Sequence, residues 1–179
     1  MKRNSTPALQ AIREKLTRAQ TAFFRAADTI AAEKWSACPG MSEWSAAQLV
    51  AHLVGVERAI VTRVDQLTQK EPIPVPFPKR LHLPMWLVEA RVIRRKSPVP
   101  LDESLIGEKE AMLAGLRGVR ERTLAFIAET ERRDLSAYCW RHPFLGTLNV
   151  YEWMEMIAAH QLRHAKQVRE IEAKLSRKL

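Results

Sequence analysis

The spacing of apolar residues restricts the possible folds of this chain more than any other feature. Over four long segments, apolar side chains recur every three or four positions, which is the period of an amphipathic α-helix. No segment shows the two-residue alternation that predicts a strand. The predicted long helices cover residues 7–34, 46–71, 103–131 and 150–175. We therefore expect an all-α protein, and specifically a four-helix bundle.

Two of these helices have clear start signals. Ser45 with Gln48, and Asn149 with Glu152, each have the form of a capping box. In this motif the first side chain accepts a hydrogen bond from the backbone three residues later, and the later side chain binds back to the first backbone N–H. These pairs predict helix starts at residues 46 and 150.

The connection between the second and third long helices is unusually long. Residues 71–80, EPIPVPFPKR, contain too many prolines for a helix or a central strand and predict an extended crossover. A short amphipathic helix is expected at 84–95. A second irregular segment, residues 141–146, is expected to form a loop.

Length and composition limit the class of protein. A chain of 179 residues predicts one domain, spanning 1–179. Hydrophobic residues make up 46% of it, but no uncharged apolar run of membrane-spanning length is present. The first twenty residues lack the apolar core of a secretory signal, so a cytoplasmic location is expected. The two cysteines, Cys38 and Cys139, support neither a disulfide framework nor a zinc finger.

The chain is strongly basic, with a formal net charge of +9. Such a charge supplies the electrostatic attraction for nucleic acid, but no recognised nucleic-acid-reading motif accompanies it, so nucleic acid is not the expected partner. The densest cluster could instead form a subsite for an anionic group of a cofactor or substrate. A solvated helix end is the simpler interpretation. The cluster consists of Arg91, Arg94, Arg95 and Lys96.

Three histidines point to a metal site. His160 and His164 are four residues apart and so lie one turn apart on one helix face. On a helical wheel both lie on the apolar stripe that must face the bundle interior. His52 lies on the inward stripe of the second long helix. Three neutral imidazoles suit zinc, nickel, iron or copper and leave a coordination position for water or substrate.

An alternative is that these histidines are ordinary core residues. A pair spaced by four residues is weak evidence for a metal by itself, because each ring can also be satisfied by a backbone group or a glutamate. The third inward histidine, on another helix, favours the metal, because three buried rings without a shared partner are hard to satisfy.

The segments that carry the histidines also resemble a known family. The sequences WSAAQLVAHLVGVE and HPFLGTLNVYEWMEMIAAHQLRHAKQV resemble the DinB-like superfamily, also described as YfiT-like metal-dependent hydrolases. The resemblance implies an up-down-down-up four-helix bundle, often dimeric, with one divalent metal, commonly zinc or nickel, held by His52, His160 and His164. It also implies activities that include thiol-dependent transfer and isomerisation with a low-molecular-weight thiol.

Candidates for a general base follow from the same segments. Glu57, Glu152 and His142 are nearest in sequence to the expected ligands. Glu57 is expected to be solvated or paired with Arg58 or Arg63, since it lies well away from the inward histidine on the wheel. Glu152 is expected to be engaged in capping, and His142 is the remaining weak catalytic candidate.

Three further side chains share the stripe of His160 and His164. Gln167 follows one turn after His164, so it is a candidate to hydrogen-bond a ligand imidazole or a bound water, or else a neighbouring helix. Trp153 and Met156 are expected to be core residues.

The histidines and the resemblance together predict a metal-dependent enzyme, of the thiol-transferase or hydrolase type, that acts on a small molecule. The resemblance also implies a homodimer. A basic helical binding module for nucleic acid or a protein partner is the alternative from another class. A family member that binds metal without turnover is a third possibility.

Overall fold

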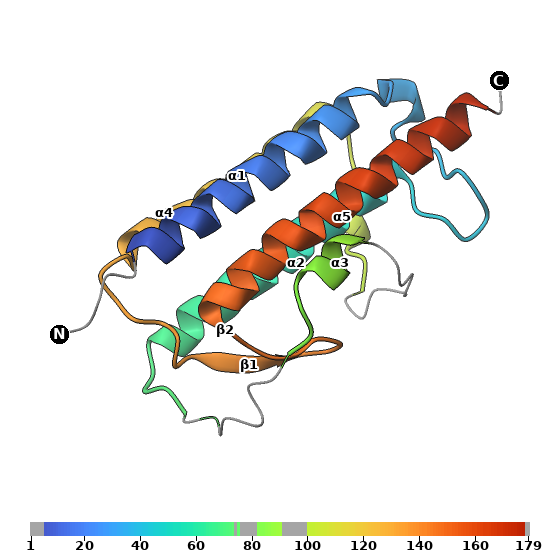
Figure 1. The fold of residues 1–179 in the computed structure, drawn as a ribbon. Helices are drawn as coiled ribbons and strands as arrows, with labels where there is room; N and C mark the ends of the chain where they lie inside the picture. Colours follow the sequence, from blue (N-terminus) through green and yellow to red (C-terminus); the bar gives the residue numbers. More distant parts are fainter. Residues whose placement is uncertain (1–5, 74, 76–81, 91–99, 178–179) are drawn as a thin grey trace.

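Four long helices make up most of the molecule in a computed structural model of the chain (Figure 1). The structure describes residues 6–73, 75, 82–90 and 100–177. The long helices are α1 (Thr6–Asp28), α2 (Ala46–Thr68), α4 (Lys109–Glu129) and α5 (Val150–Ser176). The predicted fold class and the four-helix bundle are confirmed. Within the described residues, no helix combines the length and the apolar character needed to cross a bilayer.

Both predicted capping boxes are present. The Ser45 hydroxyl accepts a hydrogen bond from the Gln48 N–H at 3.2 Å, and the Gln48 amide oxygen accepts one from the Ser45 N–H at 3.0 Å. Asn149 and Glu152 make the same pair of bonds at 3.0 and 2.7 Å. Each box satisfies N–H groups that a helix start leaves without a partner. The boxes thereby set where α2 and α5 begin.

Two apolar clusters show in which direction each long helix runs. One joins the end of α1, the starts of α2 and α4 and the end of α5, through residues that include Ile30, Leu49, Met112 and Ile171. The other joins the opposite ends, through residues that include Leu9, Val64, Ile127 and Trp153. Hence α1 and α5 run one way and α2 and α4 the other, which is the up-down-down-up order. Because α2 and α4 are parallel, the chain must return along the bundle between them, and this requires the long crossover.

A two-stranded hairpin precedes α5, where a loop at 141–146 and no strand were expected. In it β1 (Cys139–His142) pairs antiparallel with β2 (Gly146–Asn149). The expectation was wrong because strands of four residues are too short for a clear alternation. Gly146 has a φ of 102°, a conformation that glycine adopts without steric cost and that three-residue hairpin loops use.

Three long helices are shorter than predicted, and α2 ends at Thr68 and not at residue 71. Helix α1 ends at Asp28 and not at residue 34, and a separate 3-10 turn, η1 (Ala32–Lys34), follows it. Helix α4 begins at Lys109 and not at residue 103, after a second such turn, η3 (Glu103–Leu105). The apolar spacing continues through these tighter turns, so periodicity alone overestimates the helices.

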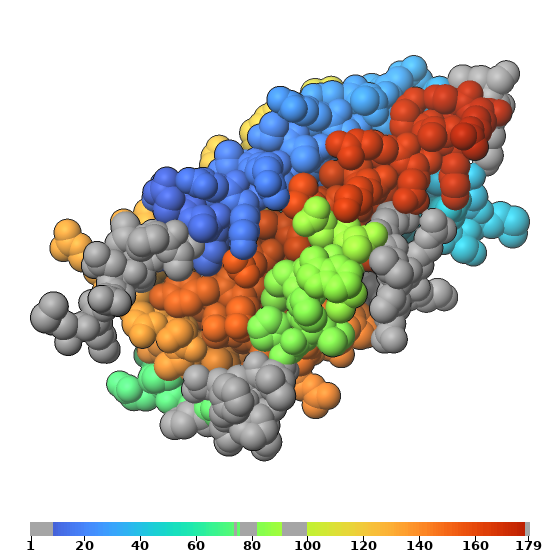
Figure 2. Space-filling view, in the orientation of Figure 1, coloured from blue at the N-terminus to red at the C-terminus, as the bar shows by residue number. Residues whose placement is uncertain are grey.

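The crossover carries a short helix, α3 (Trp86–Ala90), within the predicted range 84–95. Lys166 on α5 donates to the Glu89 carbonyl at 2.9 Å, and Arg163 donates to the Val88 carbonyl at 3.3 Å. Figure 2 shows α3 lying on the outer surface of α5. The crossover therefore packs on the part of α5 that carries the histidine pair. Residues 84 and 85 are not helical, so the helix begins later than predicted. Residues 91–95 of the predicted helix lie outside the described residues, and so does the basic cluster of Arg91, Arg94, Arg95 and Lys96.

Candidate metal centre

Three histidine rings from two helices meet inside the bundle. His52 lies in the second turn of α2, and His160 and His164 lie one turn apart on α5. Nε2 of His160 is 3.2 Å from Nε2 of His52 and 3.0 Å from Nε2 of His164. One ring nitrogen from each residue lies within 4.8 Å of the other two. The structure thus brings together the three histidines that the sequence singled out.

Burial favours the neutral form of two of these rings, His52 and His160. His52 and His164 are each 6% exposed, whereas His160 keeps part of its surface accessible. Burial lowers the pKa of His52 to about 4. Burial also lowers the pKa of His160 well below its usual value, and positive charge on His164, His52, Arg163 and His142 lowers it further. A neutral imidazole keeps one nitrogen lone pair available for a ligand.

The metal-free protein should lose stability as the pH falls from about 6.5 towards 4. Histidines in the unfolded chain take up protons through about pH 6.5, whereas His52 and His160 in the folded chain resist protonation because their pKa values are lowered. The stability that they contribute is complete above pH 6.5 and is lost as the pH falls. Urea unfolding between pH 7.5 and 4 measures this. A double variant, His52→Gln with His160→Gln, should show a smaller decrease, and an equal decrease in both proteins would contradict the assignment.

The Nδ1 atoms of His164 and His52 differ in their hydrogen bonding. Nδ1 of His164 lies 3.0 Å from the Gln167 amide oxygen. Because that oxygen only accepts hydrogen bonds, Nδ1 carries the hydrogen and the Nε2 lone pair of His164 faces the other rings. Nδ1 of His52 is buried and has no hydrogen-bond partner among the described residues. The Trp44 ring packs on His52 with ring centroids 5.2 Å apart, a contact that the sequence analysis missed.

The donor set fits a divalent transition metal. Nitrogen ligands at 2.0–2.1 Å from a tetrahedral zinc ion lie about 3.3 Å from one another, and the Nε2 separations of 3.0 and 3.2 Å are close to that value. Lone pairs that face one another repel unless a proton or a cation lies between them. Three imidazoles would leave the fourth position of a tetrahedral ion open.

Gln167→Ala should weaken zinc binding about 10- to 100-fold, which is the usual cost of removing a partner that orients a ligand. The hydrogen bond from His164 to Gln167 is the contact removed. Zinc affinity can be measured by competition with a chromophoric chelator. Gln69→Ala, at an exposed site whose side chain binds Asp65, is the matched control. Equal affinities in the two variants would contradict an orienting role for Gln167.

His142 lies at the end of β1 and packs on the same face of α5 as the histidine pair. Its ring packs against Trp153 with centroids 5.1 Å apart, and Trp153 stacks on Trp140 at 4.5 Å. Burial lowers the pKa of His142 to about 4. Trp153 and Met156 are 5% and 3% exposed, so both are core residues, as expected. The hairpin therefore adds an aromatic wall next to α5.

The prediction that Glu57 is solvated or paired with Arg58 or Arg63 is wrong. Glu57 is 4% exposed, and Arg120 binds both of its carboxylate oxygens at 2.8 and 3.0 Å. The Thr123 hydroxyl donates to the same carboxylate at 2.7 Å. The helical wheel identified only the stripe of α2 that faces the histidines, whereas a second face of α2 packs on α4. With both oxygens occupied, Glu57 is not a free base.

The buried ion pair belongs to a network with members from all four long helices. Arg120 is 1% exposed and also donates to the Gln161 amide oxygen at 2.8 Å and to the Leu16 carbonyl at 2.6 Å. Arg120 and Gln161 were not predicted from the sequence. A signal was available, because Arg120 follows Leu116 by four residues and thus lies on the apolar stripe of its helix.

Both carboxylate oxygens of Glu152 also have hydrogen-bond partners. One carboxylate oxygen accepts the capping hydrogen bond from Asn149, and the other lies 3.0 Å from Nε2 of His82 on the crossover. The predicted capping role is present, and the second contact attaches the crossover to the start of α5. Glu152 is therefore not available as a base either.

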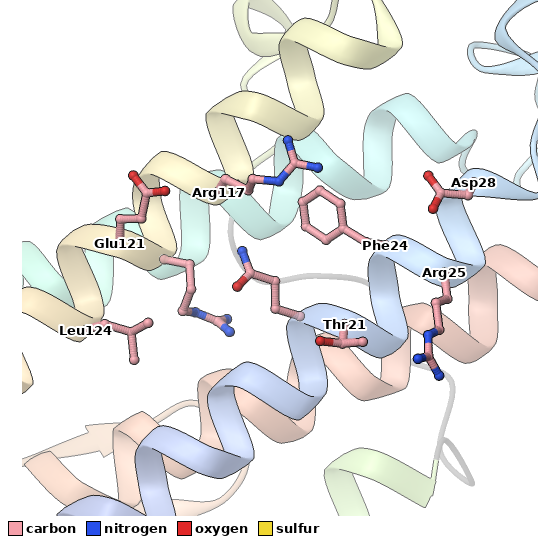
Figure 3. A pocket seen from close by; sticks show the side chains of 9 residues that line it. Thr21, Phe24, Arg25, Asp28, Arg117, Glu121 and Leu124 are labelled. Carbon is pink, nitrogen blue, oxygen red and sulfur yellow. The ribbon is translucent and has the colours of Figure 1, made fainter.

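A surface groove lies elsewhere on the molecule, between α1 and α4. It has a volume of about 360 Å³ and is lined by polar and charged side chains with Phe24 and Leu124. Figure 3 shows Arg117 beside the Phe24 ring, with the guanidinium carbon 4.6 Å from the ring centroid. None of the three histidines lines this groove.

Comparison with known proteins agrees with this architecture. The family model described as the DinB superfamily matches residues 15–168. Uncharacterized protein YuaE of Bacillus subtilis (strain 168) is 28% identical over 148 residues, which cover 81% of this chain and 87% of that protein. The solved structure of YfiT from Bacillus subtilis, described as a probable metal-dependent hydrolase with an unusual four-helix bundle topology, matches with a TM-score of 0.66. That match has 13% sequence identity and covers 98% of this chain and 92% of YfiT, so it shows the shared fold. The chain belongs to the DinB superfamily.

Proposed function

We propose that this protein is a metal-dependent enzyme, a hydrolase or a thiol S-transferase, with one divalent ion held by His52, His160 and His164. The observation that carries the proposal is that one ring nitrogen from each of the three histidines lies within 4.8 Å of the others, with two Nε2 separations, 3.0 and 3.2 Å, that suit a tetrahedral ion. Membership of the DinB superfamily supports it, and so does the description of YfiT as a probable metal-dependent hydrolase.

The residues around the centre have separate tasks in this proposal. A bound divalent ion supplies a Lewis acid that activates water or a thiol at neutral pH. Gln167 holds the His164 ring with its Nε2 lone pair directed inward. Trp44 shields one side of His52 from water. His160 keeps an accessible surface, so a substrate approaches from its side.

Zinc or nickel is the proposed metal, since imidazole nitrogen suits both. A low-molecular-weight thiol is the proposed co-substrate of the transferase reaction, because zinc and nickel also accept sulfur ligands. The partners in this proposal are a small-molecule substrate and a second copy of the chain in a homodimer. Glu57 and Glu152 have no part in proton transfer, because both carboxylates are already bound.

Metal analysis of protein purified without a histidine tag tests the proposal. We expect about one equivalent of zinc or nickel per chain, and turnover in a screen of thiols and electrophiles that a chelator abolishes. A metal-free protein whose affinity for duplex DNA falls steeply with salt would instead support the basic binding module. Stoichiometric metal without turnover across the screen would support the non-catalytic family member.

A further inference from the structure

The tip of the hairpin holds His142 in one hydrogen-bonding arrangement. The backbone N–H groups of Phe144 and Leu145 both donate to Nδ1 of His142, each at 3.1 Å. An N–H group can donate only to a nitrogen that keeps its lone pair. When the ring is neutral, its hydrogen must therefore be on Nε2. Burial lowers the pKa of this ring to about 4, so the neutral form dominates at pH 7.

The turn that supplies these two N–H groups is attached on both sides. His142 pairs with Gly146 across the hairpin, and the Leu83 N–H on the crossover donates to the Leu145 carbonyl at 2.8 Å. On the other side, the Trp153 indole N–H donates to the Trp140 carbonyl at 3.4 Å. The imidazole is thus positioned by a strand pair, the crossover and α5. A donor held in this way needs little reorganisation when a ligand arrives.

His142 lies on the same side of α5 as the proposed metal centre. His142 packs on Trp153, which precedes His160 by two helical turns and so lies on the same face of α5. Positive charge on His142 also contributes to the lowered pKa of His160. Nε2 of His142 makes no hydrogen bond within the described part of the chain.

We propose that His142 donates a hydrogen bond through Nε2–H to an oxygen of the substrate bound at the histidine centre, and that it is not a general base. This inference rests on the proposed function. A general base needs a free lone pair, but Nδ1 already accepts two hydrogen bonds and Nε2 carries the hydrogen. A neutral imidazole used as a donor stabilises negative charge that develops on oxygen, as in enzymes that polarise a carbonyl group.

The surroundings of His142 indicate the class of substrate. The donor selects compounds with a carbonyl or carboxylate oxygen. The rings of Trp153 and Phe144 flank His142, and Trp140 stacks on Trp153. These aromatic rings favour an apolar group next to that oxygen.

Nitrogen-15 NMR of the metal-free protein at pH 7 tests the arrangement of the ring without any need for activity. Long-range ¹H–¹⁵N spectra, assigned with a His142→Gln variant, should show hydrogen on Nε2 and none on Nδ1. The pattern should not change between pH 6 and 8. Hydrogen on Nδ1, or a doubly protonated ring at pH 7, would overturn the proposal.

Binding of acetate to the zinc-loaded protein tests the donor itself. His142→Phe keeps an aromatic ring against Trp153 but removes the N–H, so acetate affinity should fall about 10-fold or more, as for the loss of one hydrogen bond to a charged group. His142→Gln, which restores an N–H donor, should recover part of the affinity. Zinc affinity should stay within about twofold of the wild type in both variants, and a large loss would make His142 a ligand and overturn its role as a donor.

The outcomes for the two proposals differ. A wild-type protein that binds no zinc overturns the proposed function and, with it, the donor role of His142. Zinc binding with equal acetate affinity in the wild type and His142→Phe overturns the role of His142 alone.

Discussion

Replacing His160 with alanine should reduce zinc affinity by at least about 100-fold. His160 is the central ring, since its Nε2 lies within 3.2 Å of Nε2 in both His52 and His164. Loss of a direct ligand should exceed the 10- to 100-fold effect of losing an orienting partner such as Gln167. The helix should tolerate the change, because alanine has the highest helix propensity and the exchange removes a polar ring from a largely buried position. Zinc affinity by chelator competition, with circular dichroism to verify folding, measures the effect.

His82→Ala is the matched control for this experiment. It also removes an imidazole, but His82 binds Glu152 and the Leu83 carbonyl and belongs to no cluster of ligand atoms among the described residues. Its zinc affinity should remain within about twofold of the wild type. A His160→Ala protein that keeps zinc affinity within tenfold would refute the centre as proposed.

Arg120→Met should lower the free energy of unfolding by about 3–5 kcal/mol, which is the usual cost of breaking a buried ion pair by removing one partner. The substitution would leave the Glu57 carboxylate buried with only the Thr123 hydroxyl, and it would leave the Gln161 amide oxygen and the Leu16 carbonyl without Arg120. Urea unfolding at pH 7 measures the loss.

Two further variants show whether the loss comes from the network. Arg122→Met, at an exposed position of the same helix, should change stability by no more than about 0.5 kcal/mol. Adding Glu57→Leu to Arg120→Met should restore part of the stability, because a buried charge without its partner is then removed. A loss below about 1 kcal/mol in Arg120→Met would show that the network is not the principal polar connection between the helices.

The fold could be predicted where a signal extends over many residues. The four long helices were found from apolar spacing, and α2 and α5 begin as predicted because capping boxes are local motifs. The hairpin was missed because its strands have four residues each. The last residue of α1 and the first residue of α4 were predicted wrongly. A 3-10 turn lies next to each, and such a turn preserves the apolar spacing but not the α-helical hydrogen bonds.

The candidate site could be predicted in part for a similar reason. His52, His160 and His164 were selected because each lies on an inward stripe, which is a property of one helix. The network around Glu57 could not be selected in this way. Arg120 is 63 residues from Glu57, and Gln161, which binds Arg120, is 41 residues from it. Only the packing of α2 on α4 and α5 brings those three side chains together.

The amino-acid sequence by itself determined the helices, their inward faces and the identity of the three histidines, because periodicity and capping act over a few residues. Tertiary packing alone decided that the Nε2 atoms of His52 and His160 lie 3.2 Å apart, that Arg120 is buried against Glu57, and that the hairpin directs two N–H groups at Nδ1 of His142. These features depend on the distance and rotation between separate elements. Those quantities follow from how whole faces pack, and no short stretch of sequence specifies them.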